Sequence, residues 1–341
     1  MTRAEQVRLS TPQKPEEEET QYHICVYGKH HDPLFQMYKV AAEFLAQTRR
    51  LVTCTVEGFF ETQYEQQLRY VISKHGGSFV QSKPSVPLIF AETEDSILYF
   101  LNQKRFFDWA FKRFKYEDNT RLIFYKRIGN RALRSVKAGT GRSYCCIGFA
   151  VNDEPQELLH LELFDEECPT LARNFLDLLQ HAKFNGHPVH RVKAGSWVQA
   201  GDLVDGSGLN SEAANGGFLR HESFQIKHDR PGLLGMANHG KDTNGSQFYV
   251  TLREMPFLDG RSVIFGRVIS GMRTMLKISR MPTRNERPLN SVTVHAQAEH
   301  TVLGSIQLQA DQKEVTAATK LQSIQRGRQD RRDAEKRKSQ G

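Results

Sequence analysis

The sequence predicts two domains of different fold class, an α/β domain followed by an all-β domain, with a polar segment at each end. Over roughly the first 125 residues short apolar runs alternate with helical periods, which is typical of an α/β fold. From about residue 144 short strand-like runs are separated by Gly-rich turns. A chain of 341 residues also exceeds what one hydrophobic core usually serves. We therefore expect domains at 21–125 and 144–300, joined by a linker at 126–143.

The N-terminal segment predicts a disordered leader. Residues 1–20 contain Pro12, Pro15 and four consecutive glutamates at 16–19, with few apolar side chains. Such a segment cannot bury enough apolar surface to offset the entropy that is lost on ordering.

Charge and cysteine content argue against several classes of protein. The net charge is +8, and residues 311–341 hold nine Lys or Arg against five Asp or Glu. A surplus in one tail is more often a solvated or partner-binding segment than a nucleic-acid site, so we expect no nucleic-acid partner. No apolar run approaches the roughly 20 residues that span a bilayer, and the chain starts without an apolar signal sequence, so we expect no membrane and a cytoplasmic location. The cysteines form no Cys-x-x-Cys pair and no zinc spacing, which indicates free thiols and no metal site. They are Cys25, Cys54, Cys145, Cys146 and Cys168.

The first domain shows the order strand, helix, strand, helix, strand, helix. Apolar runs that predict strands and helical periods that predict helices alternate at 24–27, 34–45, 51–56, 64–71, 86–90 and 97–114. The last of these is rich in aromatic residues and predicts a helix over its whole length.

Two places in this domain resemble the thioredoxin and glutaredoxin family. They are residues 26–35 and the Val86-Pro87 step. At the places of the family's two redox cysteines this chain has Asp32 and Phe35, so the resemblance implies a redox-inactive, thioredoxin-like domain. The Val86-Pro87 step resembles the family's cis-proline turn and is equally compatible with a strand that begins at proline.

A basic segment with the composition of a linker follows. Residues 126–143 include Gly129, Gly139 and Gly141. Strand-like residues then alternate at 145–151 and 158–164, as in a half-buried hairpin. A helix is predicted from Pro169, with apolar positions at Leu171, Phe175, Leu178 and Leu179.

Four short sequence blocks between residues 190 and 266 contain the candidate functional residues. In order they are His190-Arg191 with Gln199-Ala200-Gly201-Asp202, then residues 232–238, 243–249 and 257–266. Together they resemble the cyclophilin family of peptidyl-prolyl isomerases. The resemblance implies an antiparallel β-barrel capped by helices and an isomerase acting on X-Pro bonds of a protein segment.

The isomerase reaction requires a hydrogen-bond donor rather than a covalent catalyst. Rotation about an X-Pro bond faces a barrier of about 18–20 kcal/mol, because the nitrogen lone pair is delocalised into the carbonyl group. A donor aimed at the prolyl nitrogen stabilises the twisted state selectively, and arginine stays charged and presents a fork of donors. The resemblance implies that Arg191 is this catalytic arginine and that Gln199 orients it. No cofactor is implied.

The resemblance also implies a substrate groove that this chain has altered. Ala237 and Asn238 align with the main-chain clamp for the residue before proline, and Gln247 lies in the same groove. At five positions that line the proline pocket in the family, this chain has a different residue. They are Ser196 where the family has Phe, Trp197 where it has Met, Tyr249 where it has Phe, Phe257 where it has Trp, and Ser262 where it has His. Leu258 is the same as in the family. Serine in place of a buried aromatic loses roughly 1.5–3 kcal/mol of apolar contact. We expect weakened isomerase activity, with Trp197 able to refill the gap.

The C-terminal residues 301–341 predict a polar helical tail. Within it residues 321–331 resemble the IQ motif, which implies calmodulin or a calmodulin-like light chain as a partner. The implied contacts are Leu321, Gln322, Arg326, Gly327 and Arg331. A solvated charged helix that binds nothing remains the alternative.

The whole arrangement resembles a branch of the cyclophilin family in which a redox-inactive domain precedes a diverged isomerase domain. Residues 196–202 and 282–288 support this resemblance, which implies a cilium or flagellum and axonemal partners. Two hypotheses follow. Retained Arg191, Gln199, Asn238 and Gln247 favour an isomerase of weakened activity. The substitutions favour a non-catalytic docking component of an axoneme that binds calmodulin through its tail.

Overall fold

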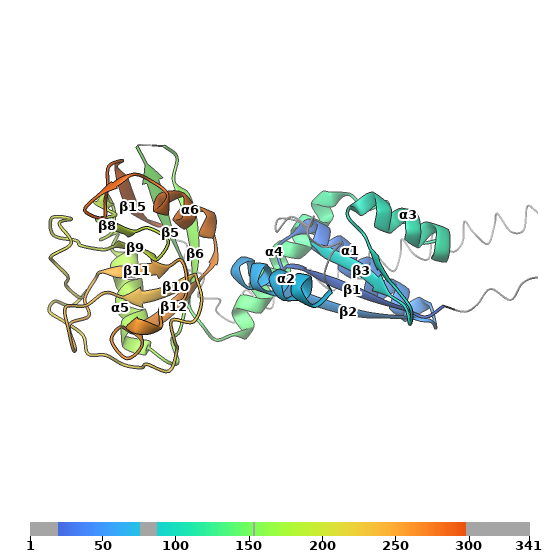
Figure 1. Cartoon of the computed structure of the whole chain (residues 1–341), viewed down its shortest axis with the longest axis horizontal. Helices are drawn as coiled ribbons and strands as arrows, with labels where there is room; N and C mark the ends of the chain where they lie inside the picture. The colour runs from blue at the N-terminus through green and yellow to red at the C-terminus, as the bar shows by residue number, and fades with distance from the viewer. Residues whose placement is uncertain (1–19, 76–86, 153, 298–341) are drawn as a thin grey trace, which may run out of the picture.

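The computed structural model describes residues 20–75, 87–152 and 154–297, which form two lobes side by side (Figure 1). The expected leader, apart from Thr20, and the expected tail with its motif at 321–331 lie outside the described residues.

The N-terminal lobe is a three-layer α/β domain. Its elements are β1 (Tyr22–Lys29), α1 (Pro33–Thr48), β2 (Val52–Phe59), α2 (Glu61–His75), β3 (Leu88–Glu92), β4 (Ile97–Tyr99), α3 (Gln103–Phe114) and α4 (Leu122–Gly139). The sheet order is β2-β1-β3-β4, with β1 parallel to β2 and antiparallel to β3. Because side chains alternate along a strand, Ile24 and Val26 pack with α1 and α3 while Cys25 packs with α2 on the opposite face. The prediction of an α/β domain is confirmed.

The expected helix over 97–114 begins later than predicted. Residues Ile97–Tyr99 form strand β4, which pairs with β3, and the helix starts only at Gln103. Its N-cap is Asn102, whose side chain accepts a hydrogen bond from the Arg105 amide at 3.0 Å. Such a cap fixes the start of a helix more strongly than the apolar pattern before it.

The segment expected as a linker is mostly helical. Helix α4 covers most of 126–143, and its Gly129 lies against α1's N-terminal turn. A Cβ atom at Gly129 would lie 2.6 Å from the His31 carbonyl oxygen. This glycine therefore permits close packing between α4 and the first domain, rather than flexibility between domains.

Asp32 and Phe35, at the places of the redox cysteines, have structural roles. The Asp32 side chain caps α1 by accepting from the Leu34 amide at 2.8 Å, and Phe35 is buried. Val86 lies outside the described residues, so the isomer of the Val86-Pro87 bond stays a prediction.

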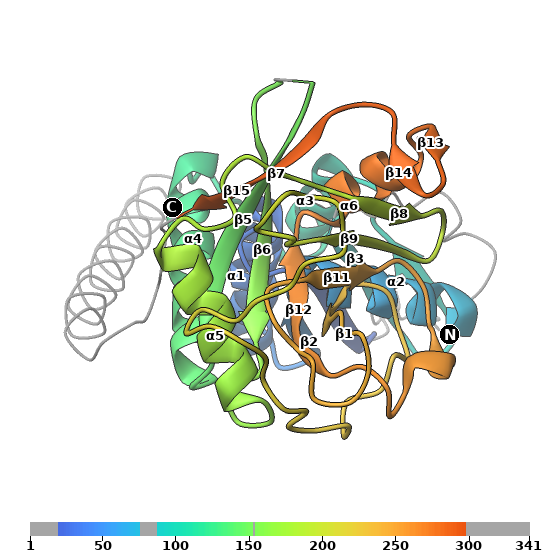
Figure 2. The ribbon, with the colours of Figure 1, turned by 90° about the vertical axis from the view of Figure 1, so that its left-hand side faces the viewer.

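The C-terminal lobe is built on one curled antiparallel sheet. Its strands are β5 (Tyr144–Val151), β6 (Glu157–Leu163), β7 (His187–Pro188), β8 (Arg191–Lys193), β9 (Trp197–Ala200), β10 (Leu233–Met236), β11 (Phe248–Thr251), β12 (Ile264–Ser270) and β15 (Val292–Gln297). Their order is β7-β15-β5-β6-β12-β10-β11-β9-β8, so the two edge strands come from one short segment. The sheet is a half-barrel rather than the closed barrel expected. Helices α5 (Pro169–Gln180) and α6 (Met272–Ser279) pack on it (Figure 2).

The core of this lobe is aromatic. Phe175 of α5 packs against Phe184, Phe248 and Phe265, with ring centroids 5.3–5.4 Å apart. The apolar positions expected on this helix are all buried, namely Leu171, Phe175, Leu178 and Leu179. The prediction of a helix from Pro169 is confirmed.

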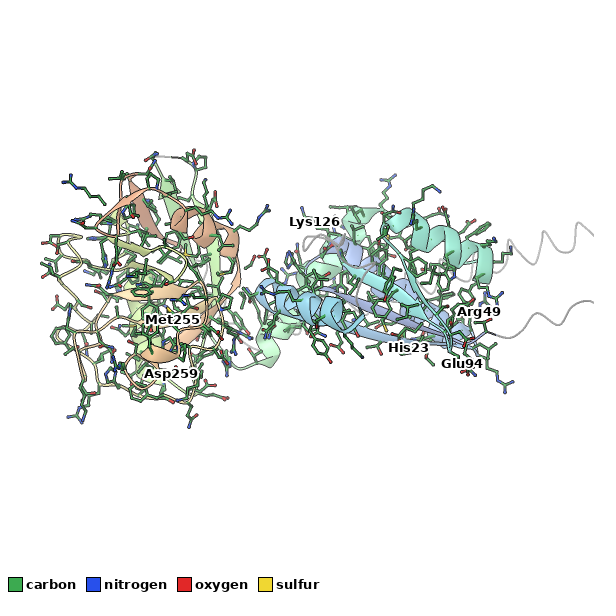
Figure 3. All side chains as sticks on the ribbon, viewed as in Figure 1. His23, Arg49, Glu94, Lys126, Met255 and Asp259 are labelled. Atoms are coloured by element: carbon green, nitrogen blue, oxygen red, sulfur yellow. The ribbon has the colours of Figure 1, made fainter. Side chains whose placement is uncertain are left out.

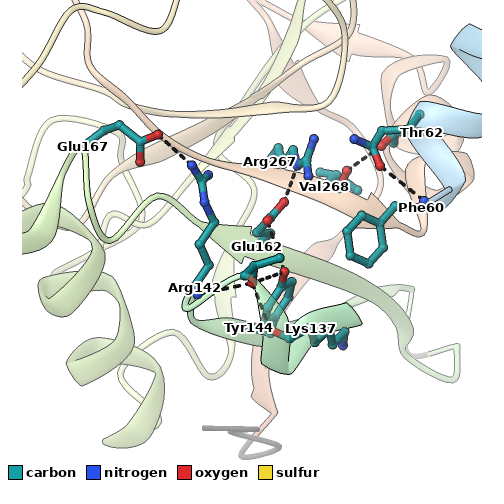
Figure 4. Close-up of polar contacts among 11 residues, drawn as sticks. Phe60, Thr62, Lys137, Arg142, Tyr144, Glu162, Glu167, Arg267 and Val268 are labelled. Carbon is teal, nitrogen blue, oxygen red and sulfur yellow. Dashed lines mark hydrogen bonds and ion pairs between the residues drawn. The ribbon is translucent and has the colours of Figure 1, made fainter. Parts of the chain in front are cut away.

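The first residues of α2 join the two lobes. Glu61 Oε2 accepts hydrogen bonds from Ser270 Oγ at 2.6 Å and from the Gly271 amide at 3.0 Å, at the turn between β12 and α6. Thr62 Oγ1 donates to the Val268 carbonyl oxygen at 2.9 Å (Figure 4). Lys29 Nζ lies 3.4 Å from Glu61 Oε1. The contact therefore pairs side chains of the N-terminal lobe with two backbone groups and one hydroxyl of the C-terminal lobe.

An apolar and charged cluster surrounds these hydrogen bonds. Phe60 packs with Tyr144 and Ile269, and the Arg267 guanidinium lies 5.7 Å from the Phe60 ring centroid (Figure 4). Arg267 also pairs with the buried carboxylate of Glu162, which accepts from the Tyr144 hydroxyl at 3.1 Å. Burial of Phe60 against Tyr144 and Ile269, together with its contact with the Arg267 guanidinium, holds the lobes in contact.

We predict that Glu61→Ala exposes the Gly271 amide. The substitution removes the acceptor of two hydrogen bonds, one from a backbone amide, and hydrogen bonds to charged groups contribute about 1.5–3 kcal/mol each. Amide hydrogen exchange at Gly271 should accelerate at least tenfold. Glu57→Ala, an exposed change on β2, is the matched control and should leave this exchange rate unchanged. Equal exchange in wild type and Glu61→Ala would contradict the interface.

The contribution of Glu61 should disappear in acid. Burial raises the pKa of Glu61, but hydrogen bonds from Ser270 and Gly271 and the charge of Lys29 outweigh burial and lower it below the usual 4.5. A lowered carboxyl pKa stabilises the folded state above the usual value, and this stabilisation is lost as the pH falls through the lowered pKa. The difference in thermal midpoint between wild type and Glu61→Ala should therefore shrink as the pH falls below about 4.5.

Candidate functional site

Four directly opposed residues form a row across neighbouring strands. The ladder pairs Arg191 on β8 with Gln199 on β9, Gln199 with Tyr249 on β11, and Tyr249 with Gly235 on β10. Opposed residues of antiparallel strands project from the same face of a sheet. The residues that alternate with them belong to the core, namely Val192, Val198, Ala200, Phe248 and Val250. The row therefore lies on the face away from the core.

The guanidinium of Arg191 is already paired with an acidic residue. Arg191 Nε donates to Glu286 Oε2 at 2.6 Å, and Lys193 Nζ donates to Glu286 Oε1 at 2.7 Å. The Arg191 side chain remains 45% exposed, and its Cζ lies 5.2 Å from the Trp197 ring centroid. Hydrogen bonds from Lys193 and Arg191 lower the pKa of Glu286 despite an opposing effect of burial. The carboxylate is thus charged at neutral pH and competes with a substrate for Arg191.

Glu286 stands in a conformation that usually belongs to glycine. It lies in the two-residue turn between β13 (Thr283–Arg284) and β14 (Arg287–Pro288), where Asn285 has φ +51° and Glu286 φ +63°. Two consecutive positive φ values indicate a type I′ turn, which favours Asn-Gly. A non-glycine residue there costs about 1 kcal/mol or more. The hairpin lies beside β8 (Figure 2), and the Glu286 carbonyl oxygen accepts from the Val192 amide at 2.6 Å.

A chain of side-chain amides fixes the wall of the groove. Trp197 Nε1 donates to Gln199 Oε1 at 3.2 Å, and Gln199 Nε2 donates to Gln247 Oε1 at 2.8 Å. Gln247 Nε2 in turn donates to the carbonyl oxygens of Gly208 at 3.0 Å and Asn210 at 2.8 Å. Gln199 therefore orients Trp197 and Gln247, and the hydrogen bond expected between Gln199 and the Arg191 fork is replaced by these contacts.

The loop that receives Gln247 is organised by one buried carboxylate. Asp202 accepts from the amides of Val204 at 3.0 Å, Gly208 at 2.8 Å and Asn210 at 3.2 Å. Burial raises the pKa of Asp202, but these backbone hydrogen bonds outweigh it and hold the pKa far below its usual range. His190 is buried with its ring against Gly208, and burial lowers its pKa. Its placement is that of a packing residue.

The expected main-chain clamp adjoins this wall. The Ala237 amide donates to the Gln247 carbonyl oxygen at 3.0 Å. Asn238 Nδ2 donates to the Arg261 carbonyl oxygen at 3.0 Å and contacts Ser262 Oγ at 3.3 Å. The structure thus brings Ala237, Asn238, Gln247 and Ser262 together.

The hydroxyl of Tyr249 has a buried polar partner. Tyr249 is buried, and its hydroxyl lies 2.7 Å from His228 Nε2, while His228 Nδ1 lies 2.8 Å from Asp259 Oδ1. Burial raises the pKa of Tyr249, so the hydroxyl stays protonated at neutral pH. A Cβ atom at Gly235 would lie 2.2 Å from the Tyr249 ring, so this glycine makes room for it.

The remaining wall positions do not form an apolar pocket. Ser196 is buried, and its hydroxyl accepts from Arg253 Nε at 3.2 Å. Phe257 is 52% exposed on the 3₁₀ helix η2 (Pro256–Leu258), whose ends are bracketed by Met255 and Asp259 (Figure 3). Leu258 is half-buried. Of these positions, Ser196 is thus buried in a polar contact and Phe257 presents an exposed aromatic ring.

The motifs in the sequence did not predict a role for Glu286, Lys193, His228 or Arg253. The one available signal was the Asn285-Glu286 pair, where a hairpin turn would favour Asn-Gly. Within the described residues no group of His, Cys, Asp and Glu is placed to hold a metal ion. Among the helices that the structure describes, none has the length and apolar content needed to cross a bilayer.

We predict that Tyr249→Phe destabilises the domain by about 1–3 kcal/mol. The change leaves His228 Nε2 buried without its hydroxyl partner, and an unsatisfied buried acceptor costs this much. Urea unfolding should show a lower midpoint with an unchanged slope. Tyr70→Phe is the control, because Tyr70 is 59% exposed. A midpoint equal to that of wild type would show that the hydrogen bond contributes nothing.

Comparison with known proteins places this geometry in a family. Residues 147–298 match the cyclophilin type peptidyl-prolyl cis-trans isomerase family. The chain is 30% identical over 224 residues to a cattle protein named probable inactive peptidyl-prolyl cis-trans isomerase-like 6, covering 61% of this chain and 73% of the relative. The human protein of the same name is 27% identical over 304 residues, covering 83% of this chain and 92% of the relative. The mouse NK-tumor recognition protein is 38% identical over 165 residues, covering 45% of this chain but 11% of that longer protein. The chain belongs to the cyclophilin family and is homologous to its isomerase-like 6 proteins.

Proposed function

We propose that this protein binds X-Pro segments of a partner protein in the groove beside Arg191 and isomerises them slowly. The observation that carries the proposal is the Arg191–Glu286 ion pair. The polarising donor is retained and exposed, but a carboxylate already occupies its Nε. Weakened turnover follows from competition for the guanidinium rather than from its loss.

The fixed wall supports peptide binding. Gln199 and Gln247 are held by mutual hydrogen bonds, so they lose little side-chain entropy when a peptide binds. Asn238 is likewise fixed through the Arg261 carbonyl oxygen. Preorganised hydrogen-bonding groups position a substrate even where an apolar pocket is weakened.

A non-catalytic docking role is the second candidate. It is favoured by Phe257, which is 52% exposed where the family has a binding aromatic, and by Ser196, which hydrogen-bonds to Arg253. The isomerase-like 6 relatives are themselves named probable inactive. In this role the groove holds a proline segment without turning it over.

We expect removal of the Glu286 carboxylate to accelerate isomerisation. A protease-coupled assay on a proline peptide should show wild-type activity just above background and Arg191→Ala at background. Glu286→Gln and Glu286→Gly should raise kcat/KM by up to about fivefold, because an exposed ion pair is worth roughly 0.2–1 kcal/mol. Glycine also suits the positive φ at this turn.

Lys193→Ala is the matched control for this assay. It removes the other cation on Glu286 and leaves the Arg191 contact in place, so kcat/KM should stay within about twofold of wild type. Background rates in wild type, Arg191→Ala and both Glu286 variants alike would reject catalysis and leave the docking role.

The N-terminal domain is proposed to be a thioredoxin-like module without redox chemistry. The sheet order β2-β1-β3-β4 with antiparallel β3 supports this proposal, as do the helices on both faces. Asp32 and Phe35 serve as a helix cap and a core residue, so the module would bind rather than exchange disulfides.

The tail is proposed to bind calmodulin or a calmodulin-like light chain in a ciliary or flagellar axoneme. Helical spacing of Leu321 and Ile324 with flanking basic residues supports the binding, and the axonemal location rests on resemblance to the family branch. Residues 321–331 lie outside the described residues.

We predict that Arg326→Glu abolishes capture by calmodulin. The reversed charge would oppose the acidic rim of a calmodulin lobe, whereas Arg284→Glu, on the hairpin of the isomerase domain, changes the net charge equally and should not matter. The assay measures capture of the full-length protein on calmodulin beads, once with calcium and once without it. Capture of Arg326→Glu at the wild-type level would contradict the assignment of a calmodulin-binding motif to residues 321–331.

A further inference from the structure

A cavity lined by basic residues adjoins Asn238, one of the expected clamp residues. Its volume is about 760 Å³, and the side chains that give it chemical character are Arg220, His221, Asn238, Lys241, Asp242 and Arg261. Asn238 is shared by the cavity and the groove, since it lines the cavity and belongs to the expected clamp for the residue before proline. A peptide in the groove would therefore pass the mouth of this cavity.

The lining of the cavity has a net positive charge, because it holds three Arg or Lys side chains and one carboxylate. Arg220, Lys241 and Arg261 are exposed, and none of them forms an ion pair with any residue in the part of the chain that the structure describes. The one carboxylate in the lining belongs to Asp242, and it accepts from the His221 amide at 2.9 Å. Arginine side chains that line one cavity without a carboxylate ion-pair partner are suited to a phosphate or carboxylate ligand.

Acidic residues of neighbouring segments are engaged elsewhere. Glu222, directly after His221, accepts from the Thr170 amide at 2.9 Å and the Leu171 amide at 2.8 Å, at the start of α5. Asp259, directly before the Gly260 of the lining, accepts from the His228 amide at 2.9 Å. These carboxylates accept from backbone amides, and neither forms an ion pair with Arg220, Lys241 or Arg261 within the described residues.

The frame of the cavity is fixed by side-chain to backbone hydrogen bonds. Asn238 Nδ2 donates to the Arg261 carbonyl oxygen at 3.0 Å, which joins the two walls. The loop between them is closed by Thr243, whose Oγ1 accepts from the His239 amide at 2.9 Å and donates to the Gly240 carbonyl oxygen at 2.8 Å. The charged side chains thus extend from a preorganised backbone.

We propose that this cavity binds an anionic side chain, a phosphoserine or a glutamate, carried by the same peptide whose proline lies in the groove. The proposal rests on the proposed function, because it requires a peptide in the groove. It adds a substrate class: proline segments with a phosphorylated or acidic residue on the amino side of the proline. Phosphoserine is the stronger ligand, since its three oxygens and greater charge match two guanidinium forks and an ammonium group.

Labelled peptides distinguish the two anion sources. Fluorescence anisotropy would measure the Kd of full-length protein for Ala-Pro peptides in which serine, glutamate or phosphoserine stands at each of the three positions before the Ala-Pro pair. At the best position we expect phosphoserine to bind roughly five- to tenfold more tightly than serine, with glutamate between them. This preference should shrink at high salt, because the cations are exposed.

Charge reversal locates the effect. Arg261→Glu and Lys241→Glu should remove the preference for phosphoserine while leaving the Kd of the serine peptide within about twofold. Lys183→Glu, an equal charge change at an exposed residue after α5, should keep the preference. Preservation of the preference in both cavity variants would overturn the assignment to this cavity.

The outcomes separate this inference from the function beneath it. If the serine peptide binds but phosphoserine and glutamate bring no gain at any position, the anion site is rejected and the groove stands. If no peptide binds, with or without an anionic side chain, the groove and the anion site are both rejected.

Discussion

Pairing of the Arg191 guanidinium with Glu286 is the interaction that sets the charge of the candidate site. Arginine has several donors, and Glu286 engages Nε. The remaining donors stay available on a side chain that is 45% exposed. A peptide can therefore approach Arg191, but a carboxylate 2.6 Å away offsets the positive charge that would polarise the imide nitrogen. The strained turn that presents Glu286 indicates that the fold tolerates a local cost to keep the contact.

The substitutions in the groove act together rather than singly. The Arg191 guanidinium lies over the Trp197 ring, and Trp197 donates a hydrogen bond to Gln199. Gln199 therefore bonds to Trp197, while the Arg191 guanidinium bonds to Glu286. The Tyr249 hydroxyl finds a partner in His228, and Gly235 makes room for its ring. The polar departures from the family pattern thus each have a hydrogen-bond partner, whereas Phe257 stays exposed.

The sequence allowed the sheet of the second domain and its α5 helix to be predicted, because alternation and helical periods reflect burial directly. It also allowed Asn238, Gln247 and Tyr249 to be placed in one site. It could not reveal the Glu286 contact, since the Asn285-Glu286 pair signals only a local turn and the partner Arg191 lies 95 residues away. Helix α4 was missed for a related reason: Gly129 looked like a linker glycine, but it permits close packing against His31.

Contact between the lobes reaches the groove through one helix. Glu61 binds the turn that begins α6, and α6 packs against both β8 and β9, the strands that carry Arg191 and Gln199. Because protein interiors are closely packed, a shift of α6 would also disturb the two strands against which it packs. Regulation would additionally require a second arrangement of α6, and contact in one arrangement does not supply it. The N-terminal domain therefore contacts, through Glu61, the turn that begins α6, and this helix packs against the strands that carry Arg191 and Gln199.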